Sequence, residues 1–150
     1  MPGTNLLELK NVDVVFDGVI QVLRSANLEL QPGKVTALLG SNGAGKTTTL
    51  KAISGLLEIE HGKITDGQVI FDGQDITNGD PVDLFAMGIV QVLEGRKVLA
   101  HLSVEQNLMI GAHLRTDRRA VRDDIERVYH YFPQLRALSG RVSGYLSGGE

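Results

Sequence analysis

Apolar and polar residues follow one another in the first third of the chain as short strands require. Two apolar-rich segments, residues 6–16 and 22–30, predict strands, and Asp17-Gly18 predicts a turn after the first. Because a short connection places consecutive strands side by side, we expect this pair to be antiparallel. Residues 35–39 form an unbroken apolar run after a turn at 31–34. Such a run is typical of a strand that is buried on both faces.

The middle of the chain is predicted to alternate between polar connections and short strands. Residues 58–67 are polar and predict a loop, and residues 68–73 predict a short strand with its turn. The apolar residues 89–93 predict another buried strand. The charged loop at 94–97 follows that strand, at the carboxyl end where ligands bind in open α/β sheets.

Three further helices are predicted from their first residues and their apolar spacing. Asp80-Pro81 suits the cap and first position of a helix ending near residue 88. Ser103 and Gln106 form a capping box that opens a helix to about residue 114. A charged helix is expected over 117–132, with a solvated face or, alternatively, a docking surface. Its apolar positions are Val121, Ile125, Val128 and Phe132.

Composition excludes several classes of protein. The chain has 150 residues, enough for one domain with a core, and its net charge of −3 comes without a basic tract. That balance argues against nucleic acid as the main partner. There is no cysteine, no apolar run of membrane-spanning length, and no secretion signal in residues 1–5. A role at the membrane would therefore be exerted through a partner.

The strongest functional signal is the stretch Gly40-Ser41-Asn42-Gly43-Ala44-Gly45-Lys46-Thr47. It fits a glycine, four residues, and then Gly-Lys-Thr, and it lies between an expected strand and a helix of residues 48–54 that ends at Gly55. Glycines allow a tight turn whose N–H groups, together with the helix N-terminus, bind a polyphosphate. The alternative is a glycine-rich turn that only joins strand to helix.

The residue types in this stretch indicate their roles. Lys46 would contact the β- and γ-phosphates as a point charge, and the Thr47 hydroxyl would ligate Mg²⁺, which prefers oxygen ligands. Thr48 would lie at the helix N-terminus beside the phosphates. An aromatic side chain at Phe16 could stack on an adenine base, and the alternative is an ordinary core or edge aromatic.

The last residues of the chain make a resemblance specific. Leu146-Ser147-Gly148-Gly149-Glu150 resembles the signature motif of ABC transporter ATP-binding subunits, and it follows the phosphate loop in the right order. Within that family the sequence is most similar to the ATPases of branched-chain amino acid importers. The segments that carry this similarity are 37–40, 43–50, 52–57, 94–96 and 102–108. Leu93 and Leu99 depart from a proline and an aromatic residue that are usual in this subgroup.

The resemblance implies an α/β fold of the P-loop NTPase type, with antiparallel strands, a parallel core sheet and a helical subdomain. It implies a single ATP-binding domain over 1–150, with an ATP-binding core at about 1–93 and a linking loop and helical subdomain at 94–150. Phe16 aligns with the aromatic that stacks on adenine. Glu94 aligns with a position, usually glutamine, that contacts Mg²⁺ and the attacking water. Gln91 is then a structural residue unless the alignment is displaced.

The resemblance also implies partners. Two subunits would enclose ATP, and Leu146, Ser147, Gly148, Gly149 and Glu150 would face the ATP of the second subunit. Transmembrane permease subunits would be driven by this ATPase, with an extracytoplasmic solute-binding protein acting indirectly. The protein would be cytoplasmic and peripheral on the inner face of the cell membrane. The transported solutes would be branched-chain amino acids or related small polar molecules.

Some catalytic residues of the family follow the signature motif. They are a second metal-binding carboxylate, a catalytic glutamate and a switch histidine, and the sequence ends at Glu150. We therefore expect residues 1–150 to be the N-terminal part of a larger domain. The four histidines, His61, His101, His113 and His130, are expected at the surface. The alternatives are a soluble ABC-type ATPase without a permease and a module that binds nucleotide without turnover.

Overall fold

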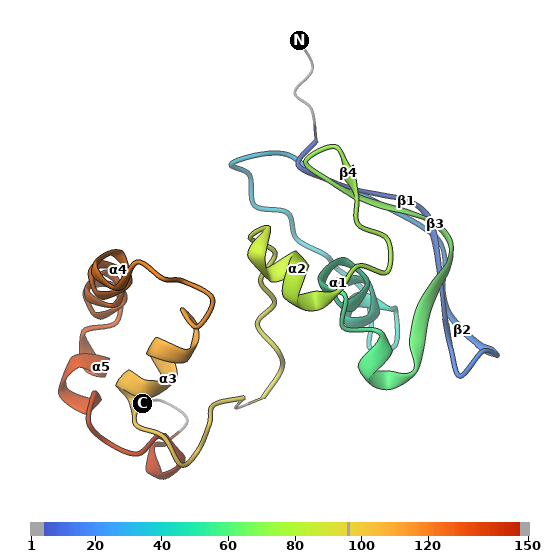
Figure 1. Cartoon of the computed structure of the whole chain (residues 1–150). Helices are drawn as coiled ribbons and strands as arrows, with labels where there is room; N and C mark the ends of the chain where they lie inside the picture. The colour runs from blue at the N-terminus through green and yellow to red at the C-terminus, as the bar shows by residue number, and fades with distance from the viewer. Residues whose placement is uncertain (1–4, 96, 148–150) are drawn as a thin grey trace. The chain divides into compact units, whose positions relative to one another are not determined.

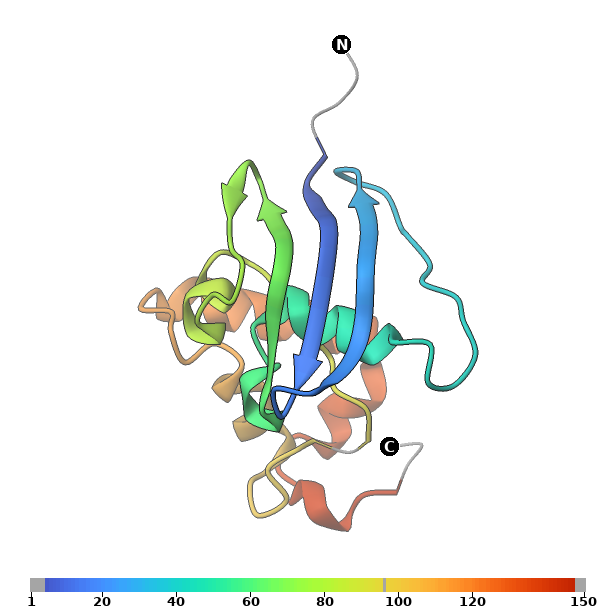
Figure 2. The same ribbon diagram turned by 90° about the vertical axis from the view of Figure 1, so that its right-hand side faces the viewer.

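The computed structural model describes residues 5–95 and 97–147, which form two compact units divided between Val92 and Leu93. The first unit is built on a four-stranded sheet in the order β2-β1-β3-β4 (Figure 2). Its strands are β1 (Leu7–Phe16), β2 (Ile20–Leu30), β3 (Gly62–Phe71) and β4 (Gln74–Asp75), and every neighbouring pair is antiparallel. The antiparallel pairing predicted for the first two strands is therefore confirmed.

The core of the first unit lies on one face of β1. Leu7, Leu9, Val12 and Val14 are almost completely buried, and they cluster with Ala52 of helix α1. The helix α1 (Lys46–Ser54) lies across one face of the sheet (Figure 2). Val12 follows a β-bulge region, and this irregularity keeps it on the buried side after Leu9.

Local chemistry sets the ends of the helices in this unit. Gly55 ends α1 in the left-handed conformation, with φ 70°, as the sequence predicts. The Asp80 side chain accepts a hydrogen bond from Val82 N at 2.8 Å, and Pro81 opens α2 (Pro81–Ala86). Both predicted roles of this pair are confirmed.

The loop predicted at 58–67 is wrong. Glu58–Glu60 form a 3-10 turn, and β3 begins at Gly62, because Lys63 and Ile64 pair with Val15 and Val14 of β1. Lys63 is exposed, whereas Ile64 is buried. Register shifts opposite residues 64–68 interrupt the alternation of apolar and polar residues, so this segment has the composition of a loop.

The strands predicted at 35–39 and 89–93 are also wrong for the residues that the structure describes. Val35 is fully exposed, Leu39 is 88% exposed and Val92 is 92% exposed. A buried parallel strand needs hydrogen-bonded neighbours and cover on both faces, and neither segment pairs with a strand among the described residues. The apolar composition is therefore present without the burial that it predicts.

The second unit consists of helices α3 (Val104–Ile110), α4 (Arg118–Tyr131) and α5 (Pro133–Leu138), followed by a 3-10 turn at Ser143–Tyr145. The capping box of Ser103 and Gln106 is confirmed, although α3 ends four residues earlier than predicted. The Asn107 side chain donates to Leu99 O, Ser103 O and Ser143 Oγ at 3.0 to 3.1 Å. It thereby joins the turns at both ends of this unit.

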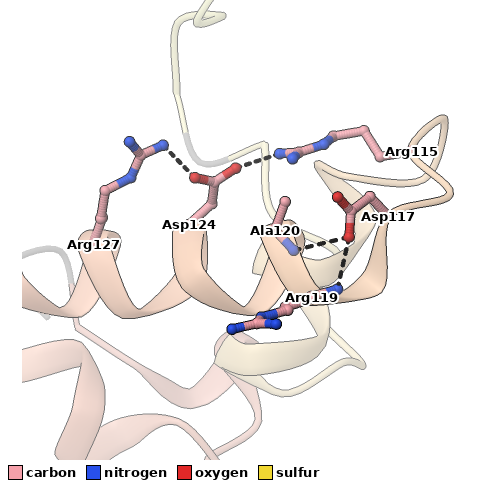
Figure 3. Close-up of polar contacts among 6 residues, drawn as sticks. All are labelled: Arg115, Asp117, Arg119, Ala120, Asp124 and Arg127. Carbon is pink, nitrogen blue, oxygen red and sulfur yellow. Dashed lines mark hydrogen bonds and ion pairs between the residues drawn. The ribbon is translucent and has the colours of Figure 1, made fainter.

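The charged face of α4 is bound by local pairs. Asp117 caps the helix by accepting hydrogen bonds from the N–H groups of Arg119 and Ala120 (Figure 3). Asp124 pairs with Arg115 and Arg127, and the hydrogen bond from Arg115 is the main cause that lowers the pKa of Asp124 (Figure 3). These contacts give the charged side chains of this solvated face partners within the same unit.

The buried stripe of α4 differs from the prediction at its end. Val121 is buried, and Ile125 and Val128 are half-buried, but Phe132 is 58% exposed. Phe132 follows the last helical residue, where the backbone leaves the helix with φ −128°. Tyr129 takes the buried place instead, and desolvation raises the pKa of its hydroxyl.

Within the two described ranges, no helix combines the length and apolar character that crossing a membrane requires.

Candidate nucleotide-binding site

The glycine-rich stretch forms a loop that leads directly into α1 (Figure 1). Gly43 and Gly45 have φ values of 85° and 84°, in the left-handed region that residues with a Cβ atom rarely adopt. Gly45 is also the cap residue of α1. The glycines therefore let the backbone turn sharply and begin a helix in the same step.

Close packing also disfavours a side chain at two of the glycines. A Cβ atom on Gly40 would lie 2.9 Å from the Cβ atom of Ala44, across the loop. A Cβ atom on Gly45 would lie 2.5 Å from Cδ2 of Leu23 in β2. The first contact packs the two sides of the loop together, and the second packs the end of the loop against the sheet.

Lys46 lies at the first position of α1, and its ammonium group is held inside the loop. Its Nζ atom donates hydrogen bonds to the carbonyl oxygens of Gly40 and Ser41, each at 2.7 Å. The Thr49 hydroxyl donates to Gly45 O at 3.0 Å and fixes the first turn of the helix. The first N–H groups of a helix have no partner within it, so this end of α1 offers positive charge and free donors together.

The oxygen of Thr47 suits a hard metal ion. Thr47 is exposed, one residue into α1, beside the loop. Among the described residues no group of three or more acidic or histidine side chains could hold a metal ion. Mg²⁺ does not need such a group, because it usually takes one or two protein oxygens and completes its shell with phosphate oxygens and water. The residues present therefore fit a magnesium ion that arrives with a phosphate ligand.

Phe16 lies at the end of β1, on the same face as the loop. It is half-buried against the core cluster that contains Val14 and Leu23. Val14 lies two residues earlier on β1 and pairs with Leu23, the residue on which Gly45 packs. Residues two apart on a strand share a face, so the aromatic ring and the end of the phosphate loop contact one core cluster on the same side of the sheet. Stacking of Phe16 on an adenine base stays a prediction.

A contact that the sequence analysis missed lies beside Phe16. Gly62, the first residue of β3, pairs with Phe16 across the sheet. A Cβ atom on Gly62 would come within 2.6 Å of the Phe16 ring. Because residues 58–67 have the composition of a loop, no sequence signal distinguishes this glycine from an ordinary turn residue.

Glu94 is exposed in a turn, next to Gly95 with φ 80°. It belongs to the second unit, whereas Thr47 belongs to the first, so their shared role at a metal ion stays a prediction. Gln91 accepts a hydrogen bond from Ser54 Oγ at 2.5 Å, which holds the segment after α2 against the end of α1. This contact agrees with the structural role expected for Gln91.

The signature segment is only partly described. Leu146 is buried and Ser147 is exposed at the end of the second unit, after the 3-10 turn. Gly148, Gly149 and Glu150 lie outside the described residues. Their role toward a second subunit stays a prediction. The four histidines are exposed, as expected.

Comparison with known families decides what this loop and sheet belong to. Residues 23–150 match the ABC transporter family. The chain belongs to this family. Its fold is that of the ABC ATP-binding cassette, a P-loop NTPase, so the predicted fold class is confirmed.

Known relatives of this ABC cassette include ATP-binding proteins of transport and import systems. A probable branched-chain amino acid transport ATP-binding protein LivF of Archaeoglobus fulgidus is 37% identical over 87% of the chain and 53% of its own length. The branched-chain amino acid transport ATP-binding protein BraG of Pseudomonas aeruginosa is 32% identical over 90% and 55%. The sulfate/thiosulfate import ATP-binding protein CysA of Synechocystis is 36% identical over 95% and 38%. The chain spans about half the length of the curated relatives it matches.

A solved structure agrees with this assignment. The chain is similar to the ADP conformation of an ATP-binding cassette of an ABC transporter, with a TM-score of 0.75 and 27% identity. The similarity covers 97% of this chain and 60% of that one. The backbone of the cassette is therefore shared at modest sequence identity.

The phosphate loop predicts a large effect of Lys46→Ala. The substitution removes the charge that neutralises the phosphates, so tight binding of MgATP should be lost. Isothermal titration with MgATP measures the effect. Asn42→Ala is the matched control and should change affinity little, because position 42 offers mainly its backbone. Undiminished affinity of Lys46→Ala would show that the loop is not the binding site.

The position of Phe16 predicts a base-dependent effect. Phe16→Ala should weaken ATP binding by roughly 1–3 kcal/mol, the usual worth of a base–aromatic stack, whereas Phe16→Tyr should bind normally. The affinity for inorganic triphosphate should be unchanged, because that ligand has no base. An equal loss for both ligands would mean that Phe16 acts on the phosphates or on the fold.

Proposed function

We propose that this chain is the nucleotide-binding part of an ATPase subunit that couples ATP binding and hydrolysis to import of a small solute. The observation that carries the proposal is that one core cluster contacts both the phosphate loop and the aromatic residue expected to stack on the base. The phosphate loop rests on Leu23 through Gly45, and Phe16 packs against the same core cluster. The same face of the sheet thus carries the phosphate loop and the aromatic ring.

Phosphate binding at this face follows from charge and geometry. Phosphoryl transfer depends mainly on positioning and on stabilisation of charge. The Lys46 ammonium balances the charge of the β- and γ-phosphates, and the N–H groups at the start of α1 hold their oxygens. Phe16 stacks on adenine and sets the distance of the base from the loop.

Magnesium would be held by the Thr47 hydroxyl and by Glu94. When bound, the ion neutralises charge on the phosphate oxygens and orients them. Both side chains supply oxygen, the ligand type that Mg²⁺ prefers. Glu94 lies three residues after Gln91, which accepts a hydrogen bond from Ser54 Oγ of α1. Lys46 and Glu94 are the catalytic residues that we propose within residues 1–150.

A second ATP-binding subunit completes the site in this proposal. Ser147 and the N–H groups of Gly148 and Gly149 in one subunit would meet the γ-phosphate on the loop of the other. Closure of the pair would then drive transmembrane permease subunits, with a solute-binding protein outside the cytoplasm delivering the cargo. The protein would act as a peripheral protein on the cytoplasmic face of the membrane.

The cargo is inferred from the relatives. LivF and BraG are branched-chain amino acid transport proteins by name, and together with the motif segments they support branched-chain amino acids or related small polar solutes. CysA is a sulfate/thiosulfate import protein of comparable identity. In this proposal the nucleotide-binding residues do not contact the cargo, so they support an ATP-driven importer more strongly than any one solute.

A module that binds nucleotide without turnover is the second function that we consider, for residues 1–150 alone. Glu94 is the acid that we place near the γ-phosphate. One carboxylate cannot easily ligate the metal and also take the proton of the attacking water. Loss of a positioned base typically costs roughly 10²–10⁴-fold in rate. The exposed apolar residues Val35, Leu39 and Val92 also favour a poorly folded or aggregating product.

Residues 1–150 expressed alone are therefore expected to release phosphate from MgATP no faster than their Lys46→Ala variant. Circular dichroism and light scattering should accompany the assay, because we expect incomplete folding or aggregation. A well-folded monomer that turns over ATP would contradict the expectation. If its turnover were lost in Glu94→Ala, Glu94 would be the general base.

The importer proposal itself is tested on the full-length protein. It should co-purify with a membrane permease, and ATP hydrolysis by the reconstituted complex should rise when the solute-binding protein carries leucine, isoleucine or valine. Sulfate is the control solute and should give no stimulation. Stimulation by sulfate would reject the proposed cargo, and an active ATPase without any permease would favour the soluble non-transport class.

A further inference from the structure

The contact between Gly62 and Phe16 is closer than any side chain at position 62 would allow. A Cβ atom there would lie 2.6 Å from Cε1 of the Phe16 ring, 2.9 Å from Cδ1 and 3.0 Å from Cζ. Ordinary contacts of a Cβ atom begin near 3.4 Å. Because these are three consecutive ring carbons, one side of the ring rests directly on the glycine.

Backbone conformation does not explain a glycine at this position. Gly62 is in β3 and is not among the glycines with positive φ. Any residue could adopt its conformation, so the requirement for glycine comes from the space above it. That space is filled by the Phe16 ring.

Neither backbone can easily move away from the contact. Asp17 N donates to His61 O at 3.0 Å, and Gly62 N donates to Leu57 O at 3.0 Å. Val19 N donates to Phe16 O at 3.1 Å. The two residues are also paired across the sheet, and Gly62 is buried. A methyl group at position 62 would therefore displace the ring rather than the chain.

We propose that Gly62 is a positioning residue for nucleotide binding: it sets the orientation of the Phe16 ring in which a purine base can stack. The inference rests on the proposed function, because it assigns a cause to the aromatic platform of that site. Stacking requires parallel faces, so a tilted ring loses the base while the phosphate loop stays intact. Gly62 should therefore act on the base and have no effect on the phosphates.

A double-mutant cycle on the full-length protein tests this role. Gly62→Ala, Phe16→Ala and the double variant are titrated with MgATP and with magnesium inorganic triphosphate. Gly62→Ala should weaken ATP binding roughly tenfold, within the span of one base–aromatic stack, and change triphosphate binding less than about twofold. In the Phe16→Ala background, Gly62→Ala should have no further effect on ATP, because contacting residues are not additive.

Gly140→Ala is the matched control. Its added Cβ atom would meet no described atom within 4 Å, and its φ is not in the left-handed region. It should bind both ligands normally. An equal loss of ATP and triphosphate affinity in Gly62→Ala would overturn the proposal, and so would a full additional loss in the Phe16→Ala background.

Thermal unfolding of the variants shows whether a folding defect in Gly62→Ala, and not the orientation of the ring, causes a loss of binding. With the ring removed, the methyl group has room, so the double variant should have the Tm of Phe16→Ala. A lower Tm would show that the backbone, and not the ring, requires glycine, and would contradict the inference. Failure of the proposed function looks different, because the unsubstituted protein would then bind neither MgATP nor triphosphate.

Discussion

β1 lies between β2 and β3, and its backbone is hydrogen-bonded along both edges. Its buried side chains Leu9, Val12 and Val14 are among the largest fully buried ones of the described residues. An unpaired backbone group in such a place would cost free energy comparable to a lost hydrogen bond, so the pairing fixes the register of all three strands. The residues of the proposed nucleotide site in the first unit are therefore positioned relative to this strand.

The two ends of the proposed site depend on that register in different ways. Phe16 is the last residue of β1 itself, and its ring rests on Gly62 of the neighbouring strand. The phosphate loop is connected indirectly, through the contact of Gly45 with Leu23, which pairs with Val14. A slip of one residue between β1 and β2 would turn Leu23 to the face opposite to that of Val14 and Phe16. It would separate the aromatic ring from the loop without changing either motif.

The sequence predicts those parts of the fold and site that depend on local chemistry. The αL glycine at Gly55, the Asp80-Pro81 cap and the Ser103 capping box are each determined by the residues beside them, and each is confirmed. Residues 68–71 of β3 were predicted as a strand, but residues 62–67 could not be recognised, because they are mostly polar and only their pairing with β1 makes them a strand. The strands predicted from the apolar runs at 35–39 and 89–93 are wrong for the converse reason. Their composition suits burial, but among the described residues no strand pairs with them. Gly62 was missed because a close approach of two strands has no local signature.

Recognition through backbone groups explains why the proposed site would bind a nucleotide's phosphates without specifying a cargo. Phosphate oxygens are bound by N–H groups, which every residue type except proline supplies, so side-chain identity matters at few positions. Glycine is favoured where an added Cβ atom would collide, as at Gly40, or where φ is positive, as at Gly45, and Lys46 supplies a cation. The remaining positions can vary widely while the backbone is kept, as 27% identity at a TM-score of 0.75 illustrates. In the proposed importer, selection for a given solute would therefore act on surfaces that contact the permease or on the partners themselves, where side chains and not backbone groups make the distinction.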